Sequence, residues 1–153
     1  MKIIKAPEPL VFNGRSLFLA GSIEMGKAVN WQEQVTKKLK GNNITILNPR
    51  RDDWDSSWEQ SIHNRKFNEQ VTWELRALEK CDIIALYFDP KTKSPISLLE
   101  FGLFAKAEKL VVFCPKGFWR KGNVDMVCAM YGIHQAKSMK EFITLIKYYL
   151  YLK

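Results

Sequence analysis

Short apolar runs, each only as long as a β-strand, alternate with helix-like segments along most of this chain. The runs contain consecutive apolar residues instead of an apolar and polar alternation, which indicates strands that are covered on both faces. The clearest runs occupy residues 16–20, 44–47, 83–87 and 110–113. Strands of this kind, separated by helices, require a parallel sheet between two helical layers. We therefore predict an α/β fold, a single-domain flavodoxin-like or Rossmann-like three-layer sandwich with a parallel sheet of about five strands.

Helical patterns fill the segments between these runs. The predicted helices occupy residues 30–40, about 58–80, 96–108, 124–130 and 139–150, with a weak strand near Ile133. Asn30 and Ser94 are N-cap candidates, and Pro95 suits a first helical position. No linker or repeat divides the chain. We predict one domain over residues 16–153, preceded by an N-terminal arm at residues 1–15.

The composition excludes several classes of protein. The chain has 153 residues, of which 46% are apolar, and this suits one globular domain. No apolar stretch approaches the roughly 20 residues of a membrane helix. Cys81, Cys114 and Cys128 form no CxxC pair, and the two histidines are far apart, so we expect neither disulfides nor a metal site. Together with the lack of a signal-peptide pattern, this indicates a cytoplasmic protein.

The formal net charge of +8 favours an anionic partner, either nucleic acid or a small phosphate. The lysines are scattered singly and in pairs along predicted helix faces, as on a solvated surface. We therefore expect small molecules as partners, and neither a membrane nor nucleic acid. Binding to DNA or RNA would show itself as a steep dependence of retention on salt.

The helix predicted at residues 96–108 places a carboxylate on its apolar side. Its apolar stripe consists of Ile96, Leu99, Leu103, Phe104 and Ala107. Glu100 falls inside this stripe, where an unpaired charge is costly. It also lies early in a helix that follows a strand, near the positive helix end and the crevice where such folds bind ligands. We expect Glu100 to be functional and ionised at neutral pH, with a structural ion pair as the alternative.

The preceding predicted helix shows the same feature. Its apolar stripe consists of Phe67, Val71 and Leu78, and Glu74 falls between the last two. Two inward carboxylates from neighbouring helices suit the cleavage of glycosidic bonds, with one group as the nucleophile and the other as the acid. We expect Glu74 to remain able to hold a proton, and a salt bridge at the helix edge is the alternative.

Two loops offer further candidates. Residues 21–27 have the glycine and lysine spacing of a phosphate-binding loop, but Ala28 replaces the hydroxyl residue and Glu24 adds a negative charge. The simpler interpretation is a turn at Gly21 and Ser22 that brings backbone close to a ligand. Residues 117–125 mix aromatic, cationic and amide side chains, which suits binding, although Trp119 could equally anchor the loop by packing.

Four segments together resemble the nucleoside 2-deoxyribosyltransferase family, in particular its nucleoside 2-deoxyribosyltransferase-like branch. They are LFLAGSI at 17–23, NPRR at 48–51, QVTWE at 70–74 and SPISLLEFG at 94–102. The resemblance extends from about residue 16 to residue 131 and implies a flavodoxin-like fold without a cofactor or metal. The implied reaction, part of nucleotide salvage, moves 2-deoxyribose between bases through a covalent glutamyl intermediate.

The resemblance also implies roles for individual residues. Glu100 matches the nucleophile, and Glu74 matches the acidic residue, an Asp in the classical enzymes, that handles the proton of the leaving base. Phe18 replaces a tyrosine that orients the nucleophile. Ser94 lies where transferases carry an Asp for the 5′-hydroxyl and where related nucleotide N-glycosidases carry a Ser for the 5′-phosphate.

Other positions are expected to bind substrate. Asn123 and Asp125 resemble a segment that the family donates across a subunit interface, which implies a homo-oligomer with shared sites. The loop at residues 48–54 is expected to face the base, with Asn48, Arg50, Asp52 and Asp53 as candidate contacts.

Three functions remain open from the sequence. The first is a nucleoside 2′-deoxyribosyltransferase, supported by the two carboxylates and the motifs. The second is an N-glycoside hydrolase of nucleoside 5′-monophosphates, suggested by Ser94 and the positive charge. The third is a catalytically silent nucleotide-binding module, suggested by Phe18 and by Glu in place of Asp at position 74.

Overall fold

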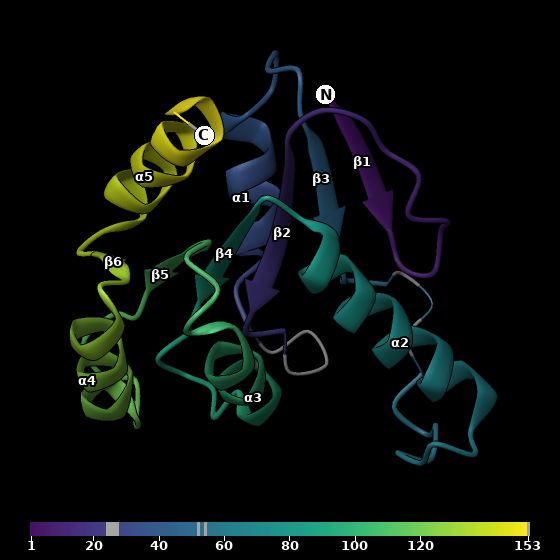
Figure 1. The fold of residues 1–153 in the computed structure, drawn as a ribbon. Coiled ribbons are helices and arrows are strands. Elements are labelled where there is room, and N and C mark those ends of the chain that lie inside the picture. Colours follow the sequence, from purple (N-terminus) through teal and green to yellow (C-terminus); the bar gives the residue numbers. More distant parts are fainter. Residues whose placement is uncertain (24–27, 52, 54, 153) are drawn as a thin grey trace.

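The computed structural model describes residues 1–23, 28–51, 53 and 55–152. Six parallel strands form one sheet in the order β1-β3-β2-β4-β5-β6 (Figure 1). The strands are β1 (Lys2–Lys5), β2 (Ser16–Gly21), β3 (Thr45–Asn48), β4 (Ile83–Tyr87), β5 (Leu110–Phe113) and β6 (His134–Ala136). The helices are α1 (Trp31–Lys38), α2 (Arg65–Lys80), α3 (Pro95–Phe104), α4 (Lys121–Tyr131) and α5 (Met139–Leu152).

The strand order confirms the predicted fold class. From β2 onward it is the flavodoxin-like order, in which the chain reverses direction across the sheet between β2 and β4. Ligands in such sheets bind beyond the carboxyl ends of the strands at this reversal. Residues 1–15, expected to be an arm, contribute β1, which pairs with β3 from Lys2 opposite Thr45 onward. The sheet thus gains an edge strand that the sequence pattern did not reveal.

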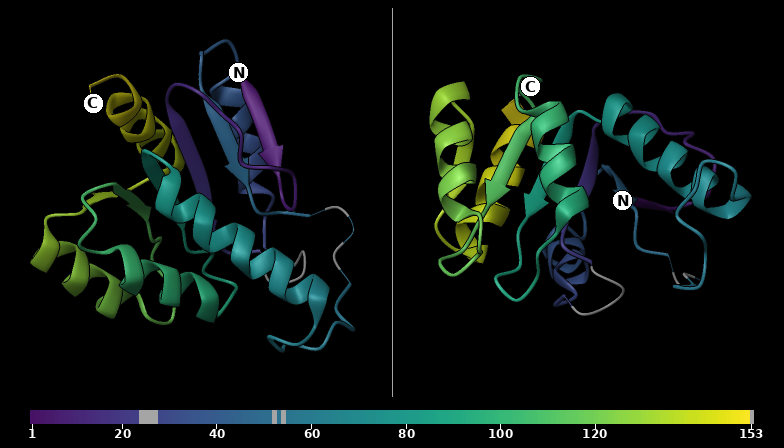
Figure 2. Two further views of the ribbon diagram at one scale, coloured as in Figure 1. Left: turned by 45° about the vertical axis from the view of Figure 1, so that its right-hand side comes forward. Right: turned by 90° about the horizontal axis from the view of Figure 1, so that it is seen from below.

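Helices cover both faces of the sheet (Figure 2). α2, α3 and α4 pack through residues such as Trp73, Phe101 and Val124 on one face. α1 and α5 pack through residues such as Trp31 and Phe142 on the other face. The apolar strands supply side chains to both cores, which is why they read as continuous apolar runs. Among the described residues, no helix is long and apolar enough to cross a bilayer.

Helix ends follow local capping. The Asn30 side chain accepts a hydrogen bond from the Glu33 backbone N–H, as expected of an N-cap. α2 begins at Arg65 rather than near residue 58, because the Asn64 side chain caps it by accepting from the Phe67 N–H at 3.1 Å. α3 ends at Phe104, four residues before the predicted end.

The predicted inward stripe of α3 is wrong. Ile96, Leu99 and Leu103 are each 59% exposed, whereas the buried positions are Ser97, Glu100 and Phe101. Phe101 meets Phe88 edge to face, with ring centroids 5.9 Å apart, and this contact fixes which side of the helix faces the sheet. Glu100 is therefore inward because it neighbours Phe101. Ile96, Leu99 and Leu103 are left on the outer surface, and Phe104 alone of the large stripe residues packs against the core.

Candidate active site

Three buried hydroxyl groups meet where β2 and β4 end. The Ser22 and Ser94 hydroxyl oxygens are 2.5 Å apart, and those of Thr92 and Ser94 are 2.7 Å apart. Thr92 donates to Ser22 Oγ or to the Asp89 carbonyl, and the Asp89 N–H also donates to Ser22 Oγ at 2.8 Å. We call Ser22, Thr92 and Ser94 the hydroxyl cluster. It ties the turn after β2 to the loop that leads into α3.

Gly21 makes this approach possible. A Cβ atom at this position would lie 2.2 Å from the Tyr87 carbonyl oxygen, and the glycine φ of 131° is unfavourable for other residues. The Ser22 N–H donates to the same carbonyl at 2.9 Å. Gly21 is therefore required by the close approach of Tyr87 in β4, and its expected closeness to a ligand stays a prediction. Residues 24–27 of the phosphate-loop pattern lie outside the described residues.

Ser94 begins α3 in an unexpected way. It occupies the N-cap position, but its φ of 47° is left-handed and its side chain makes no capping hydrogen bond. Its hydroxyl belongs to the hydroxyl cluster instead, and the residue is buried. Expected as a contact to the sugar or phosphate, Ser94 is placed by the structure as a buried link between β2 and the start of α3.

Glu100 lies in the second turn of α3 and is only 8% exposed. Burial, with the nearby Glu74 charge as a second cause, raises the pKa of Glu100 to about 8. This contradicts the expectation that the helix N-terminus keeps Glu100 ionised at neutral pH. Glu100 is the sixth residue of α3, beyond the first turn where the helix field acts, and no hydrogen bond from a described residue reaches its carboxylate.

Glu74 projects from α2 and is partly buried. Burial raises its pKa to about 7, and the hydrogen bond from Gln70 Nε2 at 2.8 Å opposes this rise. Because both pKa values are raised and the two groups repel, the pair retains a proton at neutral pH. A protonated and an ionised carboxyl can thus coexist beside β4, and this is the division of labour that an acid and a nucleophile need.

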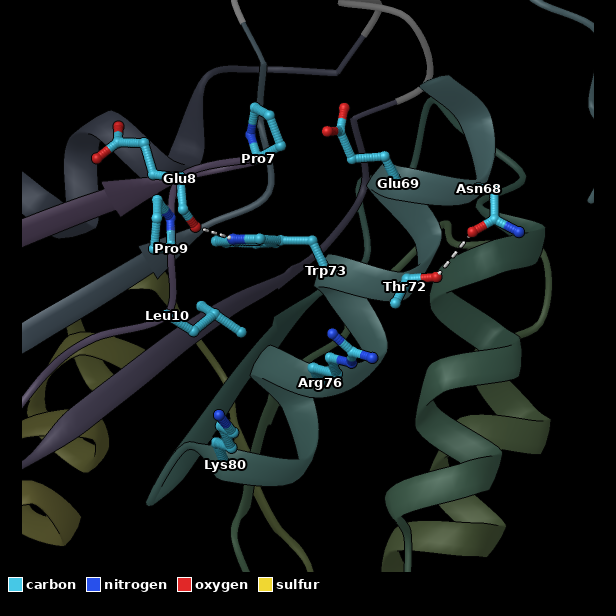
Figure 3. A pocket seen from close by; sticks show the side chains of 10 residues that line it. All are labelled: Pro7, Glu8, Pro9, Leu10, Asn68, Glu69, Thr72, Trp73, Arg76 and Lys80. Carbon is cyan, nitrogen blue, oxygen red and sulfur yellow. Dashed lines mark hydrogen bonds between the residues drawn. The ribbon is translucent and has the colours of Figure 1, made fainter. Parts of the chain in front are cut away.

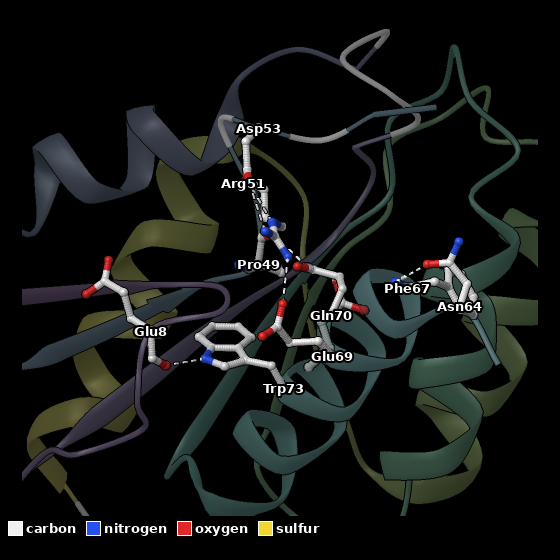
Figure 4. A network of polar contacts seen from close by, with 10 residues as sticks. Glu8, Pro49, Arg51, Asp53, Asn64, Phe67, Glu69, Gln70 and Trp73 are labelled. Atoms are coloured by element: carbon white, nitrogen blue, oxygen red, sulfur yellow. Dashed lines mark hydrogen bonds and ion pairs between the residues drawn. The ribbon is translucent and has the colours of Figure 1, made fainter. Parts of the chain in front are cut away.

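The loop after β3 contacts α2 and α1. Figure 4 shows its residues Pro49, Arg51 and Asp53 beside Glu69 and Gln70 of α2. Gln70 Nε2 donates to the Pro49 carbonyl at 3.0 Å as well as to Glu74. Asn48 Oδ1 accepts from the Arg50 N–H, so it braces the loop. Arg50 Nη1 donates to Gln32 Oε1 on α1 at 3.4 Å. The loop after β3 is therefore fixed to helices on both faces of the sheet.

Asp53, a predicted substrate contact, is engaged by its own loop. Its carboxylate accepts two hydrogen bonds from Arg51, at 2.8 and 2.9 Å, and these hold the pKa of Asp53 below its usual range. The Arg51 guanidinium also approaches Glu69 and lies over the Trp58 ring. Residues 52 and 54 lie outside the described residues.

Phe18 is fully buried in β2, with its ring centroid 6.2 Å from that of Trp73. Phe18 thus packs beneath α2 against Trp73, the residue that precedes Glu74, and its side chain carries no polar group. Trp73 is held in turn by the Glu8 carbonyl, which accepts from its indole N–H at 2.7 Å. Trp119, open to either interpretation, is half exposed, donates to the Lys93 carbonyl and lies under the Arg120 guanidinium.

Asn123 and Asp125 lie on α4. Asn123 is exposed, while Asp125 accepts from Lys121 Nζ and Gln135 Nε2, each at 2.7 Å. The partners of Asp125 are thus residues of α4 and β6, and its expected contact to substrate stays a prediction, as does that of Asn123.

A hollow of about 350 Å³ lies elsewhere, between the segment after β1 and the outer side of α2 (Figure 3). Pro7, Pro9 and Leu10 form one wall, and Arg76 and Lys80 lie on the other. Its charges are mixed, and Glu74 and Glu100 are absent from its lining. Among the described residues, no group of three or more His, Cys, Asp or Glu side chains is arranged to hold a metal ion.

Sequence reasoning missed the polar partners that organise the site, above all Gln70, Thr92 and Asp89. Gln70 had a usable signal, because it precedes Glu74 by four residues and therefore shares its helix face. Thr92 and Asp89 had none, because their partner Ser22 is about 70 residues away in the chain.

The comparisons with known proteins fit this geometry. Residues 14–118 match the family model described as "Nucleoside 2-deoxyribosyltransferase like". The chain belongs to this family. The matched segment contains both carboxylates and the hydroxyl cluster, and ends before α4. The general kind of function that the family supports is glycosyl transfer.

A solved structure shares the fold. The crystal structure of a conserved protein from Enterococcus faecalis V583 superposes with a TM-score of 0.60 at 12% identity, covering 89% of this chain and 99% of that one. At this identity the likeness concerns the fold alone. No curated protein matches the sequence of this chain.

Proposed function

We propose that this protein is a nucleoside 2′-deoxyribosyltransferase that uses Glu100 as the nucleophile and Glu74 as the acid and base. One observation carries the proposal: in a chain of this family, the helices before and after β4 each direct a carboxyl group inward, and both groups have raised pKa values. Perturbed carboxyl pairs of this kind are typical of glycosidic chemistry. The scheme requires no cofactor or metal.

The reaction is a double displacement. An ionised Glu100 carboxylate attacks C1′ of the nucleoside, and the electrons of the N-glycosidic bond move to the base nitrogen. Protonated Glu74 donates its proton to the departing base. An incoming base then loses a proton to Glu74 and attacks C1′, which releases Glu100 as a carboxylate. The first half-reaction removes the proton of Glu74 and the second returns one, so the complete cycle restores the pair.

Substrate binding must place the proton correctly. In the free protein the two carboxyl groups share the retained proton, because the pKa of each is raised. A bound nucleoside presents a partly positive anomeric carbon to Glu100 and a basic ring nitrogen to the acid. Both features favour an ionised Glu100 and a protonated Glu74, so we propose that substrate moves the proton between the two groups.

Intact mass spectrometry tests the nucleophile directly. The protein is mixed with 2′-deoxyadenosine or a slow 2-fluoro-2-deoxy analogue and quenched, beside Glu100→Gln, Glu74→Gln and the exposed control Glu79→Gln. We expect one added deoxyribosyl group on wild type and on the control, and none on Glu100→Gln. An adduct that persists in Glu100→Gln would overturn the assignment.

Product analysis separates transfer from hydrolysis. Supplying 2′-deoxyadenosine with cytosine should give 2′-deoxycytidine, whereas water as the acceptor gives free sugar. Nucleoside 5′-monophosphates supplied alone test the hydrolase alternative, for which free sugar phosphate is the expected product. The absence of an adduct and of free base with every substrate would favour the silent binding module.

We also propose that the protein forms a homo-oligomer through α3 and α4. Exposed apolar side chains cover both helices: Ile96, Leu99, Leu103, Met126, Met130 and Tyr131. A surface of this kind on adjacent helices is typical of an interface. Asn123 is exposed on the same α4, so association of two copies is a route by which it reaches a neighbouring site.

Light scattering after size-exclusion chromatography checks this assembly. Leu99→Glu should reduce the mass to that of a monomer, while Val11→Glu, at another exposed apolar position, should not. A monomeric wild-type protein would contradict the proposal.

A further inference from the structure

Gln70 is buried beside the acid and bonded in an unusual way. It is 3% exposed, and its single Nε2 group donates both to the Pro49 carbonyl, at 3.0 Å, and to Glu74 Oε1, at 2.8 Å. A carbonyl oxygen can only accept, so these contacts fix the orientation of the amide. The same side chain therefore joins Pro49 of the loop after β3 to the carboxyl group of Glu74 on α2. Figure 4 shows Gln70 beside Pro49.

The other half of the amide indicates that stability is not its purpose. Gln70 Oε1 is buried, and no described residue donates a hydrogen bond to it. An unsatisfied buried acceptor costs stability, so the contacts of Nε2 to Pro49 and Glu74 have to offset this cost. The remaining buried side-chain atoms of the described residues without a hydrogen bond are Gln32 Nε2 and Arg51 Nη1, and both belong to or contact the same loop.

We propose that Gln70 is the positioning residue of Glu74, holding its carboxyl group in one orientation relative to Glu100 and linking that orientation to the loop after β3. The proposal rests on the proposed function, in which Glu74 handles the proton of the base. Gln70 acts through Glu74 and need not touch the substrate. Its N–H favours the ionised form of Glu74, which is the form that must accept a proton from the incoming base.

The charged groups around Glu74 act on it differently from Gln70. Glu100 on α3 and Glu74 on α2 repel each other when both are ionised. The loop after β3 carries Arg50 and Arg51, whose guanidinium groups contact Gln32, and Asp53 with Glu69, respectively. The hydrogen bond that the structure shows on the Glu74 carboxylate comes from Gln70. Removing that bond therefore changes the proton affinity of Glu74 in a defined direction.

The test compares Gln70→Met, Gln70→Glu and the control Gln34→Met, which replaces an exposed glutamine on α1. The carboxyl titration of Glu74 is followed by carbon NMR in the protein without substrate. Loss of the donor should raise the pKa of Glu74 by about one unit in Gln70→Met. The added charge should raise it at least as far in Gln70→Glu, and Gln34→Met should match wild type. This readout stands even if the transferase activity is absent.

Kinetics provide the second readout. We expect kcat of Gln70→Met to fall about tenfold, with little change in KM, and the alkaline limb of its pH profile to move to higher pH. A Glu74 titration in Gln70→Met that coincides with wild type would overturn the proposal, whatever the melting temperature does. Inactive wild-type protein with a shifted Glu74 titration would instead refute the proposed function and leave the positioning role standing.

Discussion

Two buried polar regions lie near the same end of the sheet, and they are built in opposite ways. In the hydroxyl cluster, Ser22, Thr92 and Ser94 satisfy one another and the backbone of the loop after β4. In the carboxyl pair, Glu74 receives one hydrogen bond, and Glu100 receives none from the described residues. The helix α3 belongs to both, because Ser94 begins it and Glu100 lies within it.

This difference shows that some buried polar groups stabilise the fold, whereas others are kept reactive. A saturated cluster lowers its own energy and holds the chain in place. An unsaturated charged pair raises the energy of the folded state, and it retains the affinity for protons and electrophilic carbon that a reaction uses. The two regions should therefore respond oppositely to substitution and to pH.

The largest effect should come from raising the pH on the wild-type protein. The pKa values of Glu74 and Glu100 are raised on folding, so the folded state holds protons that the unfolded chain releases above about pH 4.5. The stabilising contribution of this pair is thus fully present below about pH 4.5 and is lost as the pH rises toward about 8. We expect the free energy of unfolding in urea to be roughly 4 kcal/mol lower at pH 8 than at pH 5. Equal stability at both values would contradict the raised pKa values.

A smaller effect, of opposite sign, is expected from Glu100→Gln. A neutral amide removes the repulsion from Glu74 and the cost of burying the charge. The variant should gain about 2–3 kcal/mol at pH 8 and little at pH 5, while losing at least about 10³-fold in transfer rate. Urea denaturation at both pH values measures the gain, with Glu79→Gln as the control. Equal destabilisation of Glu100→Gln at both pH values would indicate that Glu100 stabilises the fold.

The smallest effect should come from Thr92→Val, which removes one hydroxyl from the saturated cluster. It leaves Ser22 and Ser94 without a shared partner, so we expect a loss of about 1–3 kcal/mol that is the same at pH 5 and pH 8. Thr92→Ser keeps the hydroxyl and should recover most of the loss. A large fall in kcat of the folded Thr92→Val protein would indicate that the hydroxyl cluster takes part in the reaction.

The sequence predicted the positions of strands and helices better than it predicted which side of a helix is buried. The runs at 83–87 and 110–113 coincide with β4 and β5, because consecutive apolar residues can be accommodated only between two helical layers. β1 escaped prediction because Lys2–Lys5 is a short edge strand with two apolar residues, of which only Ile4 is buried. On α3 the apolar stripe indicated the wrong side, since an exposed apolar surface and a core-facing one have the same periodicity.

For Glu74 and Glu100, too, the sequence predicted some properties and not others. Their inward position was predicted, and the match to residues 14–118 supports the family that the motifs suggested. Their proton affinities could not be predicted, because burial and mutual repulsion depend on where α2 and α3 lie around β4. The pKa of Glu100, expected to be ionised, is raised by burial and by the charge of Glu74 for this reason.

By itself, the sequence determined the alternation of strands and helices and the parallel sheet, because both follow from local periodicity. It also singled out Glu74 and Glu100 as candidates, whose roles stay a prediction. Only the tertiary structure decided that Ser94 belongs to the hydroxyl cluster, that Gln70 bridges Pro49 and Glu74, and that the apolar stripe of α3 faces outward. These features depend on contacts between segments far apart in the chain. Such contacts carry no periodic signal, and their energies exist only once the strands have set the helices in place.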